Sequence, residues 1–130
     1  MSAVPAITLR PVDRFDYACA LERAMQAVPA IEASCSQPCS ITADPGQAYL
    51  TVDGQSGFYV TATGELRGLF SVVKGRGDAL VALAVERGAT GLDCFDVGPL
   101  RALYERHGFT VRESVPNWTA GGPAVLYMQR

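Results

Sequence analysis

The segment at 78–87 is predicted to be helical, and it is apolar on nearly every side. Its apolar residues are Ala79, Leu80, Val81, Leu83, Ala84 and Val85. A helix without a polar face is usually packed against a sheet, because it must bury most of its surface. The chain is therefore expected to fold as a mixed α/β protein around this helix.

Strand patterns lie on both sides of this helix. They are expected at 7–12, 49–52, 57–63, 66–73, 92–95, 109–111 and 124–128. Further helices are expected at 15–33, interrupted by Pro29, and at 100–107. The stretch at 34–46 is rich in turn-forming residues and is predicted to be a loop. This order predicts one α/β domain in which an antiparallel meander leads into a strand–helix–strand crossover.

The composition excludes several classes of protein. The chain has 130 residues, 48% of them hydrophobic, which fits one folded domain and argues against intrinsic disorder. Its net charge is −2, so extensive binding to nucleic-acid phosphates is not expected. No apolar run approaches the roughly 20 residues that span a bilayer, and residues 1–10 do not form a secretory signal. We therefore expect a soluble, cytoplasmic protein without a membrane partner.

The four cysteines are expected to be free thiols, because an apolar domain of this size needs no disulfide. They are Cys19, Cys35, Cys39 and Cys94. Cys35 and Cys39 could form half of a zinc site, but no second Cys/His pair accompanies them, so no metal is predicted. Cys94 could act as a nucleophile with His107 and Asp96. Its apolar strand argues against this role.

An anion site is predicted where the strand at 66–73 runs into the apolar helix. A helix start presents unpaired N–H groups. The glycine turn at 74–77 contains Gly75 and Gly77, which let a phosphate approach the backbone. Lys74 and Arg76 add positive charge, whereas Asp78 either favours the helix start or repels the phosphate. The alternative is a tight connection that needs a positive φ and carries two solvated basic residues. The turn matches neither the Walker loop nor the GxGxxG fingerprint.

The second informative segment is the helix expected at 100–107. Leu100, Leu103, Tyr104 and His107 fall on one face of it. Taken alone, this pattern indicates core packing, with the Tyr104 hydroxyl at the edge of the core.

Taken together, the glycine turn, the short strand and the Leu-Tyr-x-x-x-Gly-Phe helix end resemble the GNAT superfamily of acyl-CoA-dependent N-acyltransferases. The resemblance covers 66–128. The Leu-Asp-Cys-Phe-Asp strand at 92–96 is also similar to that of short GNAT-like proteins of phage type. The resemblance implies a single-domain α/β fold with a mixed, mostly antiparallel central sheet flanked by helices. It also implies acetyl-CoA as co-substrate and no metal.

The same resemblance implies roles for particular residues. The glycine turn would hold the pyrophosphate of coenzyme A, and the preceding strand would pair with its pantetheine arm. The cofactor-binding residues expected on this basis are Phe70, Ser71, Val72, Lys74, Gly75, Arg76, Gly77 and Asp78. Tyr104 would protonate the leaving thiolate, since a hydroxyl with a pKa of about 10 keeps its proton at neutral pH. Val72 departs from the Arg or Gln that is usual in the family, and the turn is shorter than usual.

The implied reaction moves an acetyl group from acetyl-CoA to an amine by direct attack. Glu65, Asp93 and Asp96 are candidates for the general base, with a water chain as the alternative. The acceptor is expected to be a small-molecule or protein amine, in a pocket shaped by 15–33 and by the loop at 115–123 with Trp118.

Two other functions stay open at this point. The first is a catalytically inactive GNAT-fold binding module, which Val72 and the short turn suggest. The second is a phage-type modifier of nucleic acid or a nucleobase, which the net charge of −2 disfavours. A homodimer is also left open.

Overall fold

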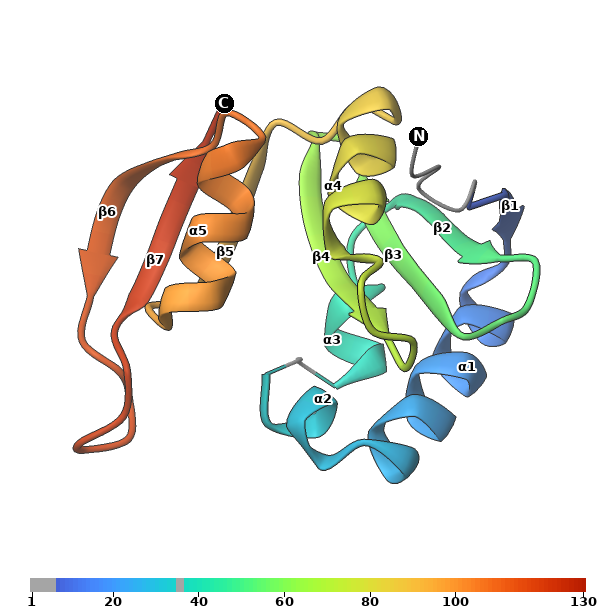
Figure 1. Ribbon diagram of the computed structural model, residues 1–130, viewed down its shortest axis with the longest axis horizontal. Coiled ribbons are helices and arrows are strands. Elements are labelled where there is room, and N and C mark those ends of the chain that lie inside the picture. The colour runs from blue at the N-terminus through green and yellow to red at the C-terminus, as the bar shows by residue number, and fades with distance from the viewer. Residues whose placement is uncertain (1–6, 35–36) are drawn as a thin grey trace.

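One seven-stranded sheet runs through the molecule, with helices on both of its faces (Figure 1). The computed structural model describes residues 7–34 and 37–130. The strands are β1 (Leu9–Val12), β2 (Gly46–Thr51), β3 (Ser56–Thr61), β4 (Glu65–Ser71), β5 (Gly91–Phe95), β6 (Thr110–Val115) and β7 (Val125–Gln129). The helices are α1 (Arg14–Ala27), α2 (Pro29–Ser34), α3 (Pro38–Ile41), α4 (Gly77–Glu86) and α5 (Gly98–Arg106).

The strand order in the sheet is β1-β2-β3-β4-β5-β7-β6. Only β4 and β5 pair in parallel, and every other pair of neighbours is antiparallel. This arrangement confirms the predicted fold class, a mixed and mostly antiparallel sheet. The helix that crosses from β4 to β5 is α4, so the predicted strand–helix–strand crossover is also confirmed.

The apolar helix α4 packs against the sheet as its composition predicts. Leu80, Val81 and Ala84 are fully buried, and Gly88 follows the helix with a positive φ of 98°. With α5, this helix covers the hydrophobic cluster on one face of the sheet. The buried residues of that cluster are Phe58, Val60, Leu66, Leu80, Val81, Ala84, Ala89, Leu92, Tyr104, Phe109, Leu126 and Met128.

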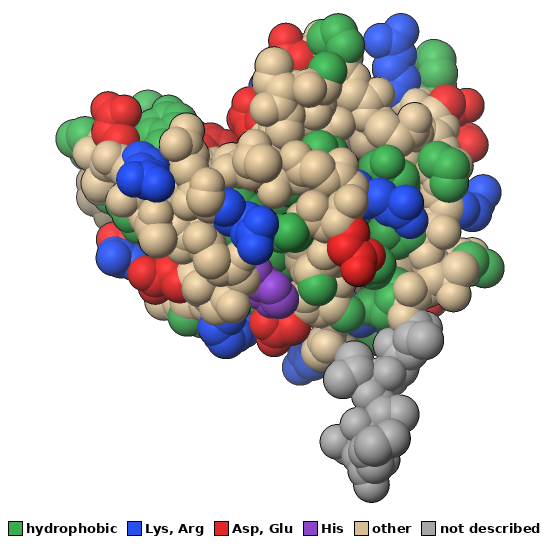
Figure 2. Space-filling view, turned by 90° about the horizontal axis from the view of Figure 1, so that it is seen from above, with side chains coloured by type: hydrophobic (Ala, Val, Ile, Leu, Met, Phe, Trp, Pro, Cys, Tyr) green, Lys and Arg blue, Asp and Glu red, His purple; other side chains and the backbone are tan. Residues whose placement is uncertain are grey.

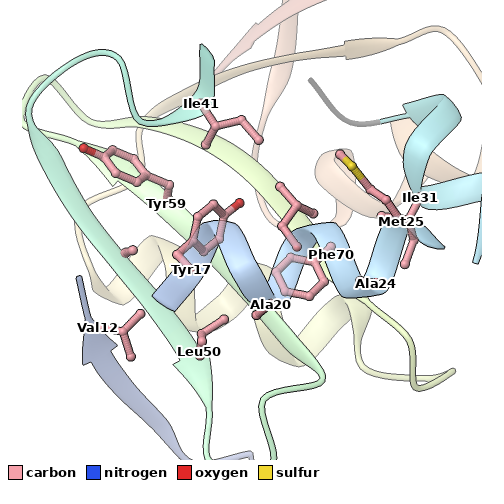
Figure 3. Packing of buried hydrophobic residues seen from close by; sticks show 12 residues of the cluster. Val12, Tyr17, Ala20, Ala24, Met25, Ile31, Ile41, Leu50, Tyr59 and Phe70 are labelled. Atoms are coloured by element: carbon pink, nitrogen blue, oxygen red, sulfur yellow. The ribbon is translucent and has the colours of Figure 1, made fainter. Parts of the chain in front are cut away.

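The opposite face of β2, β3 and β4 is covered by α1, α2 and α3. Asp13 caps α1 by accepting a 2.8 Å hydrogen bond from the Asp16 N–H, and the predicted interruption at Pro29 is present. Tyr17 of α1 is fully buried and packs edge-on against Tyr59 and Phe70, as Figure 3 shows. This second cluster completes a two-sided core.

The predicted loop at 34–46 is only partly correct. A short helix, α3, interrupts it. Pro38 stands in the first turn of this helix, where a backbone N–H would have no partner within the helix, so proline costs no hydrogen bond there. In addition, β2 begins at Gly46, earlier than predicted, and β6 extends to Val115.

Among the described residues, no helix has the length and apolar sequence that crossing a bilayer requires.

Candidate active site

The sheet opens between β4 and β5. These two strands pair only through Glu65 with Gly91 and Leu66 with Leu92, and beyond these pairs they diverge. A bulge in β4 accompanies the divergence, because Gly68 and Leu69 together oppose the single residue Phe58 of β3. The opening between the two strands therefore starts where β4 bends.

A cavity of about 370 Å³ fills this opening. Its lining comes from α3, β4, β5, α5, the loop after β6 and the start of β7. The lining residues are Ser40, Ile41, Glu65, Leu66, Arg67, Gly68, Leu69, Leu92, Asp93, Cys94, Phe95, Leu100, Tyr104, Trp118 and Val125. The volume suits a small ligand or one end of a larger one.

Tyr104 lies in the wall of this cavity. It is only 8% exposed, and its ring packs edge-on against Phe109 with the ring centroids 6.0 Å apart. The packing of Leu100, Leu103 and His107, all half-buried, confirms the predicted inner face of α5. Tyr104 is thus both a core aromatic and a cavity residue.

Two of the three candidate bases reach the cavity. Glu65 and Asp93 line it, whereas Asp96 pairs with Arg101 at 3.8 Å and is not part of the lining. Asp93 is exposed, yet partial desolvation, followed by the negative charge of Glu65, raises the pKa of its carboxyl above the ordinary value. A carboxylate with a raised pKa is a better proton acceptor at neutral pH.

The structure does not place His107 beside Cys94, as the alternative of a cysteine nucleophile would require. Desolvation and the neighbouring Asp93 and Asp96 charges raise the pKa of Cys94 to about 11, which keeps its thiol protonated. The His107 ring contacts Asp78 rather than Cys94. Cys19, Cys39 and Cys94 are free thiols, and Cys35 lies outside the described residues. Within 7–34 and 37–130, no group of three His, Cys, Asp or Glu residues could hold a metal ion.

The glycine turn lies between β4 and α4. Gly75 has a positive φ of 86° with open space around it, whereas Gly77, the first residue of α4, does not have a positive φ. A Cβ on Gly77 would instead lie 3.3 Å from Leu103 of α5. Val72 lies just past the end of β4, so its predicted place on the strand is wrong by one residue.

The two basic residues of the turn differ in their surroundings. Lys74 is exposed. Arg76 forms a 2.7 Å ion pair with Asp53 and donates a 3.1 Å hydrogen bond to the Ser56 hydroxyl. The guanidinium also holds the pKa of the Asp53 carboxyl far below its ordinary value. Arg76 is thus tied to the turn between β2 and β3.

Asp78 connects the two helices on this side of the sheet. Its carboxylate pairs with Arg106 at 3.1 Å and with the His107 ring at 2.9 Å, both near the end of α5. These partners lower the pKa of Asp78, and its side chain forms no cap at the start of α4. In Figure 2 the histidine, in purple, lies beside red carboxylate side chains on the seam between the two halves of the surface. Asp78 therefore has a structural role that the sequence did not reveal.

Phe70 and Ser71 offer their backbone rather than their side chains to the open edge of β4. The Phe70 ring is 2% exposed and packs on Tyr17. The Ser71 hydroxyl bonds to the Ser56 hydroxyl at 2.8 Å and to the Val73 carbonyl at 2.6 Å. The predicted cofactor-binding residues thus follow directly, along the chain, on the β4 residues that line the cavity, and none of the eight lines it.

Of the two segments predicted to shape an acceptor pocket, one lines this cavity and the other does not. Trp118 lines the cavity and packs on Phe95 with the ring centroids 5.8 Å apart. The described residues of α1 and α2 do not line it, and Ser40 and Ile41 of α3 do so instead. Sequence reasoning missed this wall because α3 was predicted to be a loop.

Comparisons with known proteins give a consistent fold. No family model matches the chain, and no curated protein matches its sequence. A GNAT superfamily phosphinothricin acetyltransferase from Sinorhizobium meliloti, in complex with acetyl-CoA, is similar with a TM-score of 0.63 and 17% identity, over 95% of this chain and 87% of that one. The protein yncA from Salmonella typhimurium, with its cofactor acetyl-CoA, is similar with a TM-score of 0.62 and 13% identity, over 96% and 93%.

A third similar structure is a GCN5-related N-acetyltransferase from Rhodopseudomonas palustris. Its TM-score is 0.56 and its identity 14%, over 100% of this chain and 98% of that one. At these identities the comparison concerns the fold. The structural similarity agrees with the β4–β5 opening, the cavity and the α4 crossover. We conclude that this chain has the GNAT fold.

Proposed function

We propose that this protein is an N-acetyltransferase that moves the acetyl group of acetyl-CoA to an amine. The observation that carries the proposal is the opening between β4 and β5, with Tyr104 in its wall and the glycine turn at the end of β4. Two of the similar structures were solved with acetyl-CoA bound.

The residues present fit coenzyme A at the start of α4. No described residue accepts a hydrogen bond from the N–H groups of Gly77, Asp78 and Ala79, and no side chain caps the helix. Unpaired N–H groups at a helix start, together with the positive end of its dipole, suit a phosphate. The open space at Gly75 allows close approach. We infer that this turn, with Lys74, holds the pyrophosphate.

The open edge of β4 fits an extended arm. Since β5 pairs with β4 only as far as Leu66, the following stretch of β4 has no strand on that side. An extended amide-containing chain can pair there through backbone hydrogen bonds, as an added strand would. Phe70 and Ser71 lie on this stretch and Val72 just past it.

Acetyl-CoA supplies an activated acetyl group as a thioester. The amine nitrogen of the acceptor forms a C–N bond to the acetyl carbon, and the C–S bond breaks. The nitrogen gives up a proton to a carboxylate, Glu65 or Asp93, or to a water held by one of them. The Tyr104 hydroxyl gives its proton to the departing sulfur and regains one from solvent. The products are the N-acetylated amine and the free thiol.

A GNAT-fold binding module without turnover is the alternative. One observation favours it, because the Arg76 guanidinium is engaged by Asp53 and is not directed freely at the glycine turn. The resemblance to phage-type proteins stays a prediction, and so does a cytoplasmic location.

Calorimetry with acetyl-CoA, followed by an assay of thiol release with a panel of amines, tests the proposal. An acetyltransferase binds acetyl-CoA and releases thiol only when an acceptor amine is present. Binding without amine-dependent release would favour the binding module. If acetyl-CoA does not bind at all, the proposed function is wrong.

A further inference from the structure

The ionic groups of the cavity are unevenly balanced. Three side chains of its described lining are charged at neutral pH: the carboxylates of Glu65 and Asp93 and the guanidinium of Arg67. The described lining therefore has an excess of one negative charge. This excess limits which acceptor can enter.

Arg67 is not available to a ligand. Its Nη2 atom lies 2.7 Å from the Asp44 carboxylate and 3.1 Å from the Glu65 carboxylate, and its Nη1 atom donates a 3.3 Å hydrogen bond to the Ile41 carbonyl. The two carboxylates, Glu65 and then Asp44, raise the pKa of the guanidinium further. Arg67 therefore serves as the internal counter-ion that ties β4 to α3, and an acceptor carboxylate would have to displace protein carboxylates to reach it.

Asp93 has no such counter-ion. Among the described residues, none forms an ion pair with it, although it lies beside Glu65 in the cavity lining. The Arg67 guanidinium is already paired with Glu65 and Asp44, so the negative charge of Asp93 has no ion-pair partner among the described residues. A cationic ligand group would supply the missing partner.

The aromatic residues of the cavity favour the same sign of charge. Phe95, Tyr104 and Trp118 line it, and Trp118 is 79% exposed, so that its ring is accessible from solvent. Aromatic faces attract ammonium groups through their quadrupole. The carboxylates and the rings are independent features that select for cations.

We infer that the acceptor is a small aliphatic amine that carries a second cationic group and no carboxylate, such as a diamine, with Asp93 as the residue that sets this specificity. This inference rests on the proposed function and deepens it by naming the class of acceptor. An amino acid, whose carboxylate finds no available cation in the described lining, is disfavoured.

A matched series of acceptors tests the inference. The compounds 1,4-diaminobutane, n-butylamine and 4-aminobutanoic acid share a four-carbon chain and differ in the charge at the far end. For the wild type, we expect kcat/KM to fall in that order. Since a hydrogen bond to a charged group is worth about 1.5–3 kcal/mol, each step is expected to be about 10- to 100-fold.

The variant Asp93→Asn separates recognition of charge from proton transfer. Loss of a base would slow all three amines equally, whereas loss of a cation partner lowers the ratio of kcat/KM for the diamine to that for butylamine. We expect this ratio to fall by about 10-fold or more. Glu113→Gln is the control, because Glu113 is an exposed carboxylate on β6 outside the cavity, and it should leave the ratio unchanged.

The outcomes distinguish the inference from the proposed function. Equal kcat/KM for the three compounds, or a preference for 4-aminobutanoic acid, overturns the inference while the acetyltransferase activity stands. An unchanged ratio in Asp93→Asn overturns the role of Asp93. Acetyl-CoA binding measured by calorimetry without acetylation of any of the three compounds also overturns the inference. Absence of acetyl-CoA binding overturns the proposed function and the inference with it.

Discussion

The Tyr17 hydroxyl donates a 2.6 Å hydrogen bond to the backbone carbonyl of Gly68, which lies 51 positions further along the chain. Gly68 has a positive φ of 59° and forms part of the β4 bulge, and a Cβ there would overlap the Tyr17 hydroxyl. Only glycine suits both conditions. A single buried hydroxyl of α1 thus supports the bend from which the cavity opens.

Tyr17→Phe should lower the free energy of unfolding by about 1–3 kcal/mol, because the Gly68 carbonyl loses its donor while the ring packing stays. Chemical denaturation measures this loss. Tyr127→Phe is the matched control, since Tyr127 is 44% exposed on β7, and its change should stay within about 0.5 kcal/mol. Equal stability of the two variants would show that the Tyr17 hydroxyl does not support the bulge.

Tyr104→Phe should reduce turnover by about 10²- to 10⁴-fold, the usual contribution of a positioned proton donor. The affinity for acetyl-CoA should change little, because the lost interaction acts mainly as the sulfur departs. Steady-state kinetics with the best amine and calorimetry with acetyl-CoA measure the two quantities. Turnover at the wild-type rate would leave Tyr104 as a core aromatic only.

Gly77→Val should weaken acetyl-CoA binding by more than tenfold. The new side chain would press on Leu103 and cover the unpaired N–H groups at the start of α4. Gly98→Val is the control, because Gly98 begins α5, has open space around it and also lacks a positive φ. A similar loss of affinity in both variants would argue against a pyrophosphate site at the glycine turn.

Asp53→Asn should destabilise the protein by about 1 kcal/mol at neutral pH, since the ion pair with Arg76 is half-exposed and partly screened. The pKa of Asp53 is lowered in the folded state, so its contribution is present above the ordinary value of 3.8 and is lost as the pH falls towards the folded value. The difference in melting temperature between wild type and variant should therefore shrink below about pH 4. A difference that stays constant from pH 7 to pH 3 would contradict this assignment.

The sequence predicted the parts of the fold that depend on local pattern. The apolar residues of α4, the proline that ends α1 and the glycines after α4 and α5 gave the right helices. The predicted order of helices and strands along the chain is correct apart from α3. The face that Tyr104 shares with Leu100 was also correct. Periodicity and turn chemistry are properties of neighbouring residues, so they can be read without the structure.

The parts that sequence reasoning missed depend on partners far away in the chain. The role of Asp78 needs Arg106 and His107, and the position of Arg76 needs Asp53, more than twenty residues earlier. The opening between β4 and β5 needs the bulge at Gly68, which resembles any other strand glycine in the sequence. The one available signal was a glycine inside the strand expected at 66–73.

The narrow contact between β4 and β5 has a consequence for the dynamics of the protein. The backbone ladder across the middle of the sheet consists of two residue pairs, at Glu65 and Leu66, so amide hydrogens of β5 beyond Leu92 gain no protection from β4. We expect the strands β5, β7 and β6 to exchange with solvent deuterium as a unit separate from β1 to β4. A bound molecule that pairs with the free edge would join the two units, so that slower exchange on both sides of the opening would report its presence.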